Sequence, residues 1–141
     1  MTTEFKEIEI GELIKQRVLE CKIDDQRICN FFKCTEKEIE EVYIKKSLEC
    51  EQLLKWSKLL DYDFFRIYSQ HLILYSPQAS VQYNIGNTEL PYFKKNIYTR
   101  EIIEFILDLV RTGEKSKTQI IKEYRIPKTT LYKWLSKYGK K

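Results

Sequence analysis

The apolar residues of this chain recur at three- and four-residue intervals, the spacing that places them on one face of a helix. The pattern predicts five helices in the first half, at residues 8–21, 26–32, 35–43, 48–60 and 61–75. It predicts three more in the second half, at residues 99–112, at 116–125, and from Pro127 or Lys128 onward. We therefore expect an all-α protein of two small helical domains, a five-helix bundle and a three-helix domain, each containing a helix-turn-helix.

A stretch without a sustained apolar period separates the two predicted domains. Residues 77–98 contain prolines, glycine and asparagines, and they predict a connecting segment between a bundle at 1–76 and a domain at 99–141. The closing part of this segment is too aromatic for a free linker. We expect three of its rings to pack against one of the domains: Tyr92, Phe93 and Tyr98.

Cap residues and core positions follow from the same pattern. The expected helix N-caps are Asp24 or Asp25, Thr35, Asp61 or Asp63, and Thr99, and Gly113 is expected to end the 99–112 helix. The fourth helix is expected to bury Leu53, Leu54, Trp56, Leu59 and Leu60. The 99–112 helix is expected to bury Ile102, Ile103, Phe105, Ile106, Leu109 and Val110.

The stretch from Lys117 to Ser136 predicts a helix, a tight turn and a second helix. Ser116 and Gln119 have the spacing of a capping box, and Pro127 suits a helix start. The inward positions have the spacing that holds together a DNA-binding helix-turn-helix: Ile120, Tyr124, Ile126, Leu131 and Trp134.

Two positions of this stretch depart from the usual motif. Ile121 stands where the first helix usually has a small residue, and Arg125 stands where the turn usually has glycine. A non-glycine residue in the left-handed conformation costs about 1 to 2 kcal/mol. We therefore expect a turn that is looser than usual or differently shaped.

The outward face of the second helix has the composition of a DNA-reading surface. Its polar and basic residues surround the apolar stripe: Lys128, Thr129, Thr130, Tyr132, Lys133 and Lys137. The alternative is a small amphipathic bundle with a solvated lysine face. DNA binding is favoured because generic solvated faces mix charge signs more evenly.

The formal net charge of +4 is unevenly distributed along the 141 residues. Residues 1–76 hold 12 Lys and Arg against 15 Asp and Glu, whereas residues 113–141 hold 9 against 2. A polyanion would therefore bind the C-terminal end first.

The N-terminal half repeats the helix-turn-helix spacing at Ile28, Phe32, Cys34, Ile39 and Val42, with Lys33 in place of the turn glycine. Its second helix carries four acids that would oppose DNA phosphates: Glu36, Glu38, Glu40 and Glu41. A scaffold or protein-binding role is favoured. Contact with cytosine amino groups, or with the DNA backbone through nearby lysines, stays open.

The fifth helix is apolar on more than one face. Part of it is expected to fill the bundle core: Phe64, Ile67, Tyr68 and Leu72. The remaining apolar residues would either meet a partner or be buried under the following segment: Phe65, Ile73, Leu74 and Tyr75.

The sequence gives little support for a catalytic or metal-binding site. The four cysteines form no C-x-x-C pair, and we expect Cys29 and Cys34 to be small buried thiols. The single histidine, His71, is expected on a helix surface or interface. The chain has no glycine-rich phosphate loop and no paired carboxylates aimed at one cleft. We therefore expect no catalytic residue, metal, cofactor or small-molecule ligand.

No apolar run approaches the roughly 20 residues of a membrane helix, and the first ten residues are acidic, unlike a targeting leader. These features predict a cytoplasmic protein without a membrane partner.

The residues also resemble known families. IGELIKQRV, CNFFKCTEKEI and LLKWSKLLDYDFF, between Ile10 and Tyr75, resemble the lambda repressor-like domain of small Bacteroidetes-type proteins. The stretch from Leu90 to Tyr138 is similar to the transposase-like helix-turn-helix of the same proteins. The resemblance implies DNA binding without a catalytic domain. It adds Ser136 to the DNA face and places Lys117 and Thr118 near phosphate.

Two functions compete on these observations. The first is a sequence-specific regulator or transposase-derived factor that reads double-stranded DNA with its C-terminal helix-turn-helix, as a homodimer joined by the N-terminal bundle. The second is an adaptor or antitoxin-like module that binds a protein through its acidic and aromatic helices. In that case the basic tail is a weak nucleic-acid anchor.

Overall fold

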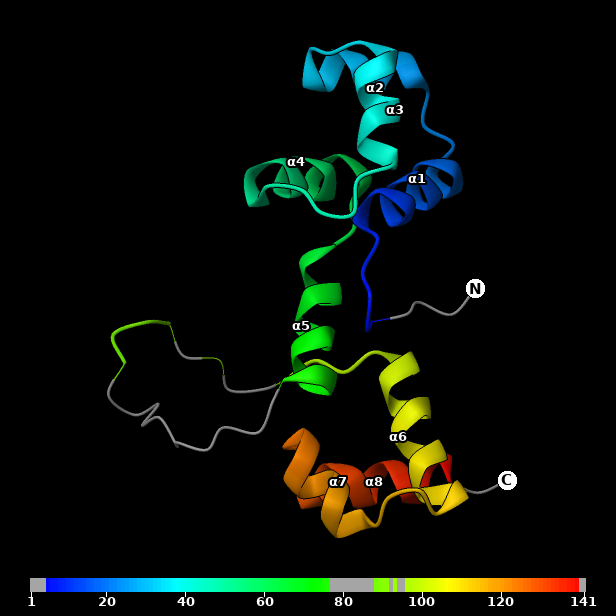
Figure 1. Cartoon of the computed structure of the whole chain (residues 1–141), viewed down its shortest axis with the longest axis vertical. Helices are drawn as coiled ribbons and strands as arrows, with labels where there is room; N and C mark the ends of the chain where they lie inside the picture. Colours follow the sequence, from blue (N-terminus) through cyan, green and yellow to red (C-terminus); the bar gives the residue numbers. More distant parts are fainter. Residues whose placement is uncertain (1–4, 77–87, 92, 94–95, 140–141) are drawn as a thin grey trace. The chain divides into compact units, whose positions relative to one another are not determined.

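The computed structural model describes residues 5–76, 88–91, 93 and 96–139, and these residues form eight helices and no strand (Figure 1). The all-α prediction is confirmed. The helices are α1 Ile10–Cys21, α2 Asp25–Phe32, α3 Glu36–Tyr43, α4 Cys50–Leu60, α5 Phe65–Tyr75, α6 Arg100–Thr112, α7 Lys117–Tyr124 and α8 Lys128–Tyr138. None of them is long and apolar enough to cross a membrane.

The chain forms two compact units, whose boundary lies inside α5 between Ser69 and Gln70. The N-terminal unit contains α1 to α4 and the start of α5. The C-terminal unit contains the end of α5 and α6 to α8. Most of the predicted connecting segment lies outside the described residues.

Helix α1 packs against α3 and α4 to form the core of the N-terminal unit. The largest fully buried side chains are apolar: Ile10, Ile14, Ile28, Trp56, Leu60 and Phe64. Two core predictions were wrong, because Leu54 on α4 is 45% exposed and Leu72 on α5 is 64% exposed. Both residues fit the helical period but face away from the neighbouring helices.

The start of α1 is joined to the segment that follows α3 through backbone hydrogen bonds. The Ile10 N–H donates to the Lys46 carbonyl at 3.1 Å, and the Gly11 N–H donates to the Lys45 carbonyl at 2.9 Å. These bonds satisfy N–H groups that a helix start otherwise leaves without partners. Gly11 is buried, and this close approach requires a residue without a side chain.

The predicted caps are largely confirmed. The side chains of Asp24, Thr35 and Thr99 accept hydrogen bonds from backbone N–H groups at the starts of α2, α3 and α6. Asp63 accepts from the Phe65 N–H at 3.0 Å before α5, and Gly113 ends α6 in the left-handed conformation. Local cap chemistry therefore determines most helix ends in this chain.

Gln70 ties α5 to the segment before α6 within the C-terminal unit. This buried side chain donates from Nε2 to the Ile97 carbonyl at 2.7 Å and accepts at Oε1 from the Thr99 N–H at 3.0 Å. Tyr98 packs edge-on against Trp134 with ring centroids 4.9 Å apart, as predicted. The same prediction was wrong for Phe93, which is 87% exposed. Tyr92 lies outside the described residues.

The buried hydroxyl of Tyr43 has no hydrogen-bond partner among the described residues. Burial, together with the charges of Asp25 and Glu40, raises the pKa of Tyr43 from 10.0 to about 12. The folded state therefore holds this proton more tightly than the unfolded chain does. The resulting stability is present below pH 10 and is lost as the pH rises towards 12.

We expect Tyr43→Phe to remove this alkaline dependence. Between pH 9 and pH 11 the wild-type unit should lose about 1 kcal/mol more unfolding free energy than the variant does. Urea denaturation followed by circular dichroism at both pH values measures the difference. Equal losses in the two proteins would show that Tyr43 ionises as easily in the folded state as in the unfolded chain.

Candidate nucleic-acid interface

Helices α7 and α8 pack against each other in the C-terminal unit, and α8 also packs on α6. Buried side chains fill the space between these helices: Ile102, Ile106, Ile120, Ile126, Leu131 and Trp134. The predicted capping box is confirmed, since Ser116 accepts from the Gln119 N–H while the Gln119 side chain accepts from the Ser116 N–H. The prediction that Phe105 is buried was wrong, because it is 39% exposed beside Tyr124.

The turn between α7 and α8 contains a residue in the left-handed backbone conformation, which glycine usually occupies in such a turn. Arg125 has φ 54° and ψ 35°. The expectation of a looser or differently shaped turn was therefore wrong. The chain accepts about 1 to 2 kcal/mol of backbone strain at Arg125, and burial of Ile126 directly after it offsets this cost.

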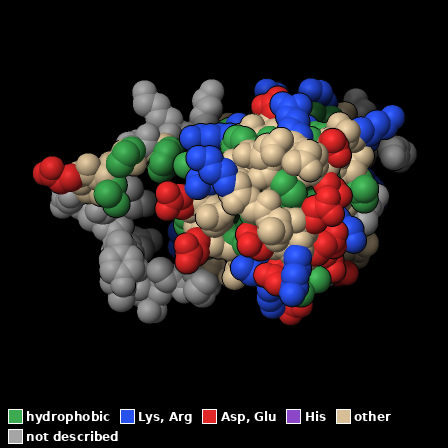
Figure 2. Space-filling model, turned by 90° about the horizontal axis from the view of Figure 1, so that it is seen from above, with side chains coloured by type: hydrophobic (Ala, Val, Ile, Leu, Met, Phe, Trp, Pro, Cys, Tyr) green, Lys and Arg blue, Asp and Glu red, His purple; other side chains and the backbone are tan. Residues whose placement is uncertain are grey.

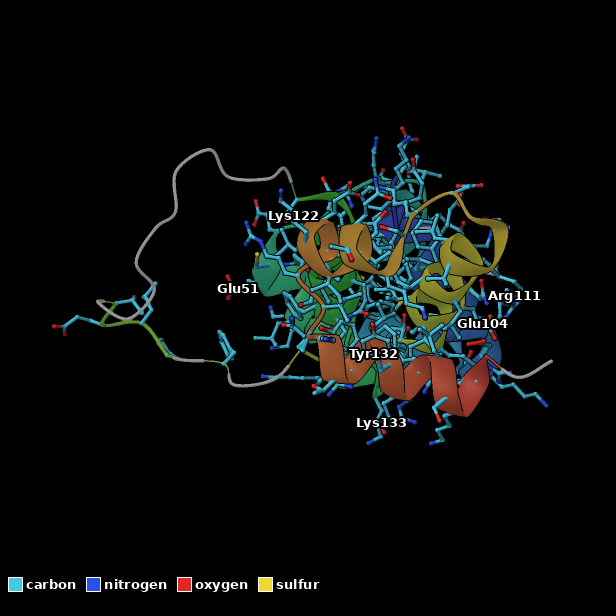
Figure 3. All side chains as sticks on the ribbon, turned by 90° about the horizontal axis from the view of Figure 1, so that it is seen from below. Glu51, Glu104, Arg111, Lys122, Tyr132 and Lys133 are labelled. Atoms are coloured by element: carbon cyan, nitrogen blue, oxygen red, sulfur yellow. The ribbon has the colours of Figure 1, made fainter. Side chains whose placement is uncertain are left out.

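The outward face of α8 carries the residues that were predicted to contact DNA. Six of the predicted residues on α8 are exposed: Lys128, Thr129, Tyr132, Lys133, Ser136 and Lys137. Figure 3 shows Lys133 projecting away from the helix. Thr130 is half-buried, so it is less available than its neighbours. Lys117 and Thr118 are exposed at the start of α7.

Tyr132 brings the start of α7 and the first turn of α8 together. The Nζ atom of Lys117 lies 5.4 Å from the centre of its ring, and that of Lys128 lies 5.7 Å away. Cations at this distance over an aromatic ring are attracted by its electron density. The contacts gather two lysines from different helices around one ring that is 43% exposed. Sequence spacing alone did not predict this cluster.

The basic face is not neutralised by neighbouring acids. Among the described residues, no ion pair involves Lys117, Lys128, Lys133 or Lys137. One acid of this region, Glu123, is already occupied by Lys115, and their hydrogen bond raises the pKa of that lysine. The lysines of α8 are therefore available to an anionic partner.

Helices α2 and α3 form a second pair with the same turn. Lys33 has φ 53° and ψ 50°, close to the values of Arg125. Aligning these two residues places Glu36 at the position of Lys128 and Glu41 at that of Lys133. The four acids of α3 are exposed, and acidic side chains are visible over the N-terminal unit in Figure 2. The two pairs thus share a left-handed turn residue at the same spacing and present opposite charges.

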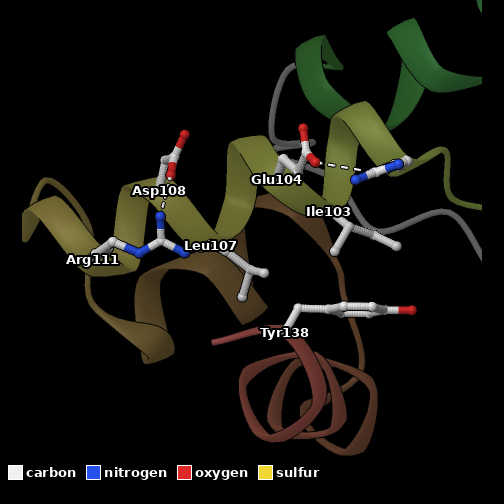
Figure 4. A pocket seen from close by; sticks show the side chains of 7 residues that line it. Ile103, Glu104, Leu107, Asp108, Arg111 and Tyr138 are labelled. Carbon is white, nitrogen blue, oxygen red and sulfur yellow. Dashed lines mark hydrogen bonds and ion pairs between the residues drawn. The ribbon is translucent and has the colours of Figure 1, made fainter. Parts of the chain in front are cut away.

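A groove of about 680 Å³ lies between α6 and the end of α8 (Figure 4). Its apolar lining is Ile103, Leu107 and Tyr138. The surrounding charges already pair along α6, since Arg100 contacts Glu104 and Arg111 contacts Asp108, each at 3.1 Å. The groove therefore brings no unpaired acid, base or nucleophile together, and no sequence pattern had predicted it.

The cysteines and the histidine do not form a site. Cys29 is buried, as predicted, whereas Cys34 is half-buried, and all four thiols are free. His71 is half-buried on α5, with its ring centre 5.2 Å from that of Tyr75. Within the described part of the chain, no three His, Cys, Asp or Glu side chains are placed to hold a metal ion.

Comparison with protein-family models, curated proteins and solved structures finds no match to this chain. The resemblance to repressor-like and transposase-like domains stays a prediction. The structural class is an all-helical protein, and its helix α8 has an exposed basic face.

Proposed function

We propose that this protein binds double-stranded DNA through α8, as a transcriptional regulator or a transposase-derived DNA-binding factor. The observation that carries the proposal is the face of α8, where exposed lysines that form no ion pair among the described residues stand on a helix held by a buried core. A helix of this diameter fits the major groove of B-DNA. The α7–α8 pair then acts as a helix-turn-helix with α8 as its reading helix.

The two lysines around Tyr132 are assigned to the DNA backbone in this proposal. Lys117 and Lys128 lie at helix starts, and exposed lysines there position a protein on phosphates without reading sequence. Lys133, one turn further along α8, is assigned to base edges together with Thr129. Lysine donates to guanine O6 and N7, and the threonine methyl group can contact that of thymine.

The specificity expected from this face is modest. Arginine is the stronger guanine reader because its planar fork donates two hydrogen bonds at once, and α8 contains no arginine. Specificity would therefore increase if two copies read adjacent half-sites. On DNA we propose a homodimer in which the N-terminal unit supplies the contact between copies and α8 of each copy stays free for its half-site.

A salt titration of the full chain on duplex DNA tests this function. The logarithm of the binding constant should fall linearly with that of salt concentration, with a slope corresponding to roughly four to seven released counterions. Fluorescence anisotropy with a labelled duplex measures it. Absence of binding at moderate salt on random-sequence duplexes would contradict the proposal, because the electrostatic contribution needs no particular sequence.

A further inference from the structure

Helices α3 and α8 each follow a left-handed residue at the same spacing in the chain, yet their outward charges are reversed. Glu36 and Glu41 on α3 stand where α8 has Lys128 and Lys133. The buried positions stay apolar in both, as Ile39 and Leu131 show. The two faces therefore present opposite charges at the same interval along a helix.

Both faces lack partners within the part of the chain that the structure describes. The ion pairs seen there involve none of the four acids of α3 and none of the lysines of α8. All of these side chains are exposed. Neither face thus has to break an ion pair before it meets a charged partner.

We propose that the acidic face of α3 in one copy binds the basic face of α8 in a second copy of this chain. The carboxylates of α3 and the lysines of α8 are exposed around the buried stripe of each helix, so they can approach one another when the two helices lie side by side. DNA is a poor occupant for α3, because its carboxylates repel phosphates. The other copy supplies the cationic helix that these carboxylates attract.

The inference rests on the proposed function only where it concerns regulation. The contact uses the same lysines that bind DNA, so self-association and DNA binding compete for α8. Association then lowers the amount of protein available for DNA, and operator binding releases α3. The contact between copies is itself independent of DNA.

Ionic strength sets the conditions for a test. Exposed ion pairs are weak one at a time and are screened by salt. The screening length is about 30 Å at roughly 0.01 M salt and about 8 Å at 0.15 M. Sedimentation velocity of the wild-type chain without DNA should therefore show association at low salt that weakens as salt is added.

Charge reversal identifies the two faces. The variant Glu36→Lys/Glu41→Lys has two basic faces, and the variant Lys128→Glu/Lys133→Glu has two acidic faces. Each alone should associate at least about tenfold more weakly than the wild type, since the contact depends on several exposed pairs acting together. An equimolar mixture of the two should regain association, because each basic face then meets an acidic one.

Two further variants complete the design. Glu49→Lys/Glu51→Lys reverses the same number of exposed charges at the start of α4, and it should associate like the wild type. If the Glu36→Lys substitution unfolds α3, the variant Glu36→Gln/Glu41→Gln replaces it in the test. We expect this variant to associate more weakly than the wild type and to have an unchanged circular dichroism spectrum.

The outcomes separate this inference from the proposed function. A monomer at every salt concentration would overturn the inference, and so would a mixture that associates no better than either variant alone. The chain could also associate as the charge-reversal variants predict and yet fail to bind duplex DNA. That result would overturn the proposed function and support the contact between copies.

Discussion

Replacing Lys128 and Lys133 together with alanine is expected to weaken duplex binding about 10- to 100-fold at roughly 0.15 M salt. Both side chains are exposed on α8 and take part in no ion pair among the described residues. Each lost phosphate contact also removes about one unit from the slope of the salt dependence. The affinity for DNA and the slope of its salt dependence should therefore both decrease.

The matched control is Lys55→Ala/Lys58→Ala, which removes the same charge from the exposed side of α4. It should change affinity only about two- to threefold, through the long-range field alone. Anisotropy titrations at four salt concentrations measure both variants. Equal losses from both would show that α8 is not the contact surface and that the protein binds DNA through its net charge.

The turn shows how far sequence reasoning reached and where it failed. Apolar spacing and cap residues predicted α7, α8 and their capping box, because hydrogen bonds between near neighbours determine these features. The turn shape was mispredicted because Arg125 looked too costly in the left-handed conformation. Burial of Ile126 and Leu131 on either side of the α8 start outweighs that cost.

The failures of core prediction have a common cause. Phe105 and Leu72 fall on apolar helical positions, yet Phe105 is 39% exposed although its ring lies beside that of Tyr124, and Leu72 is 64% exposed. Periodicity describes a helix face and does not say which neighbour reaches it. Gln70 illustrates the converse, since its two hydrogen bonds join residues far apart in the sequence.

The candidate interface was predicted in composition but not in arrangement. The residue types on α8 were readable because lysines and threonines alternate with an apolar stripe. Convergence of Lys117 and Lys128 on Tyr132 depends on how α7 crosses α8. The Glu36 and Lys128 correspondence follows from the repeated spacing in the sequence, and the structure adds that Lys33 and Arg125 share a left-handed conformation.

Gly11→Ala is expected to destabilise the N-terminal unit by about 3 kcal/mol, which lowers its melting temperature by about 10 to 20 °C. A methyl group at this position would lie 2.3 Å from the Val42 carbonyl oxygen and 2.6 Å from that of Tyr43. Backbone atoms cannot swing aside as a side chain can. Helix α1 would have to move away from α3 and lose the hydrogen bond between Gly11 and Lys45.

The neighbouring Glu12→Ala serves as the control, because Glu12 is exposed on the same turn of α1 and its loss should cost under about 0.5 kcal/mol. Differential scanning calorimetry of both variants measures the effect, and equal melting temperatures would show that α1 does not approach α3 closely. Because the basic face belongs to the other compact unit, Gly11→Ala should bind DNA normally below its transition. The same variant should lose the association between copies once α3 unfolds, since the acidic face depends on α1 for its support. One substitution at a residue outside both charged faces thereby separates DNA binding by α8 from the recognition of a second copy by α3.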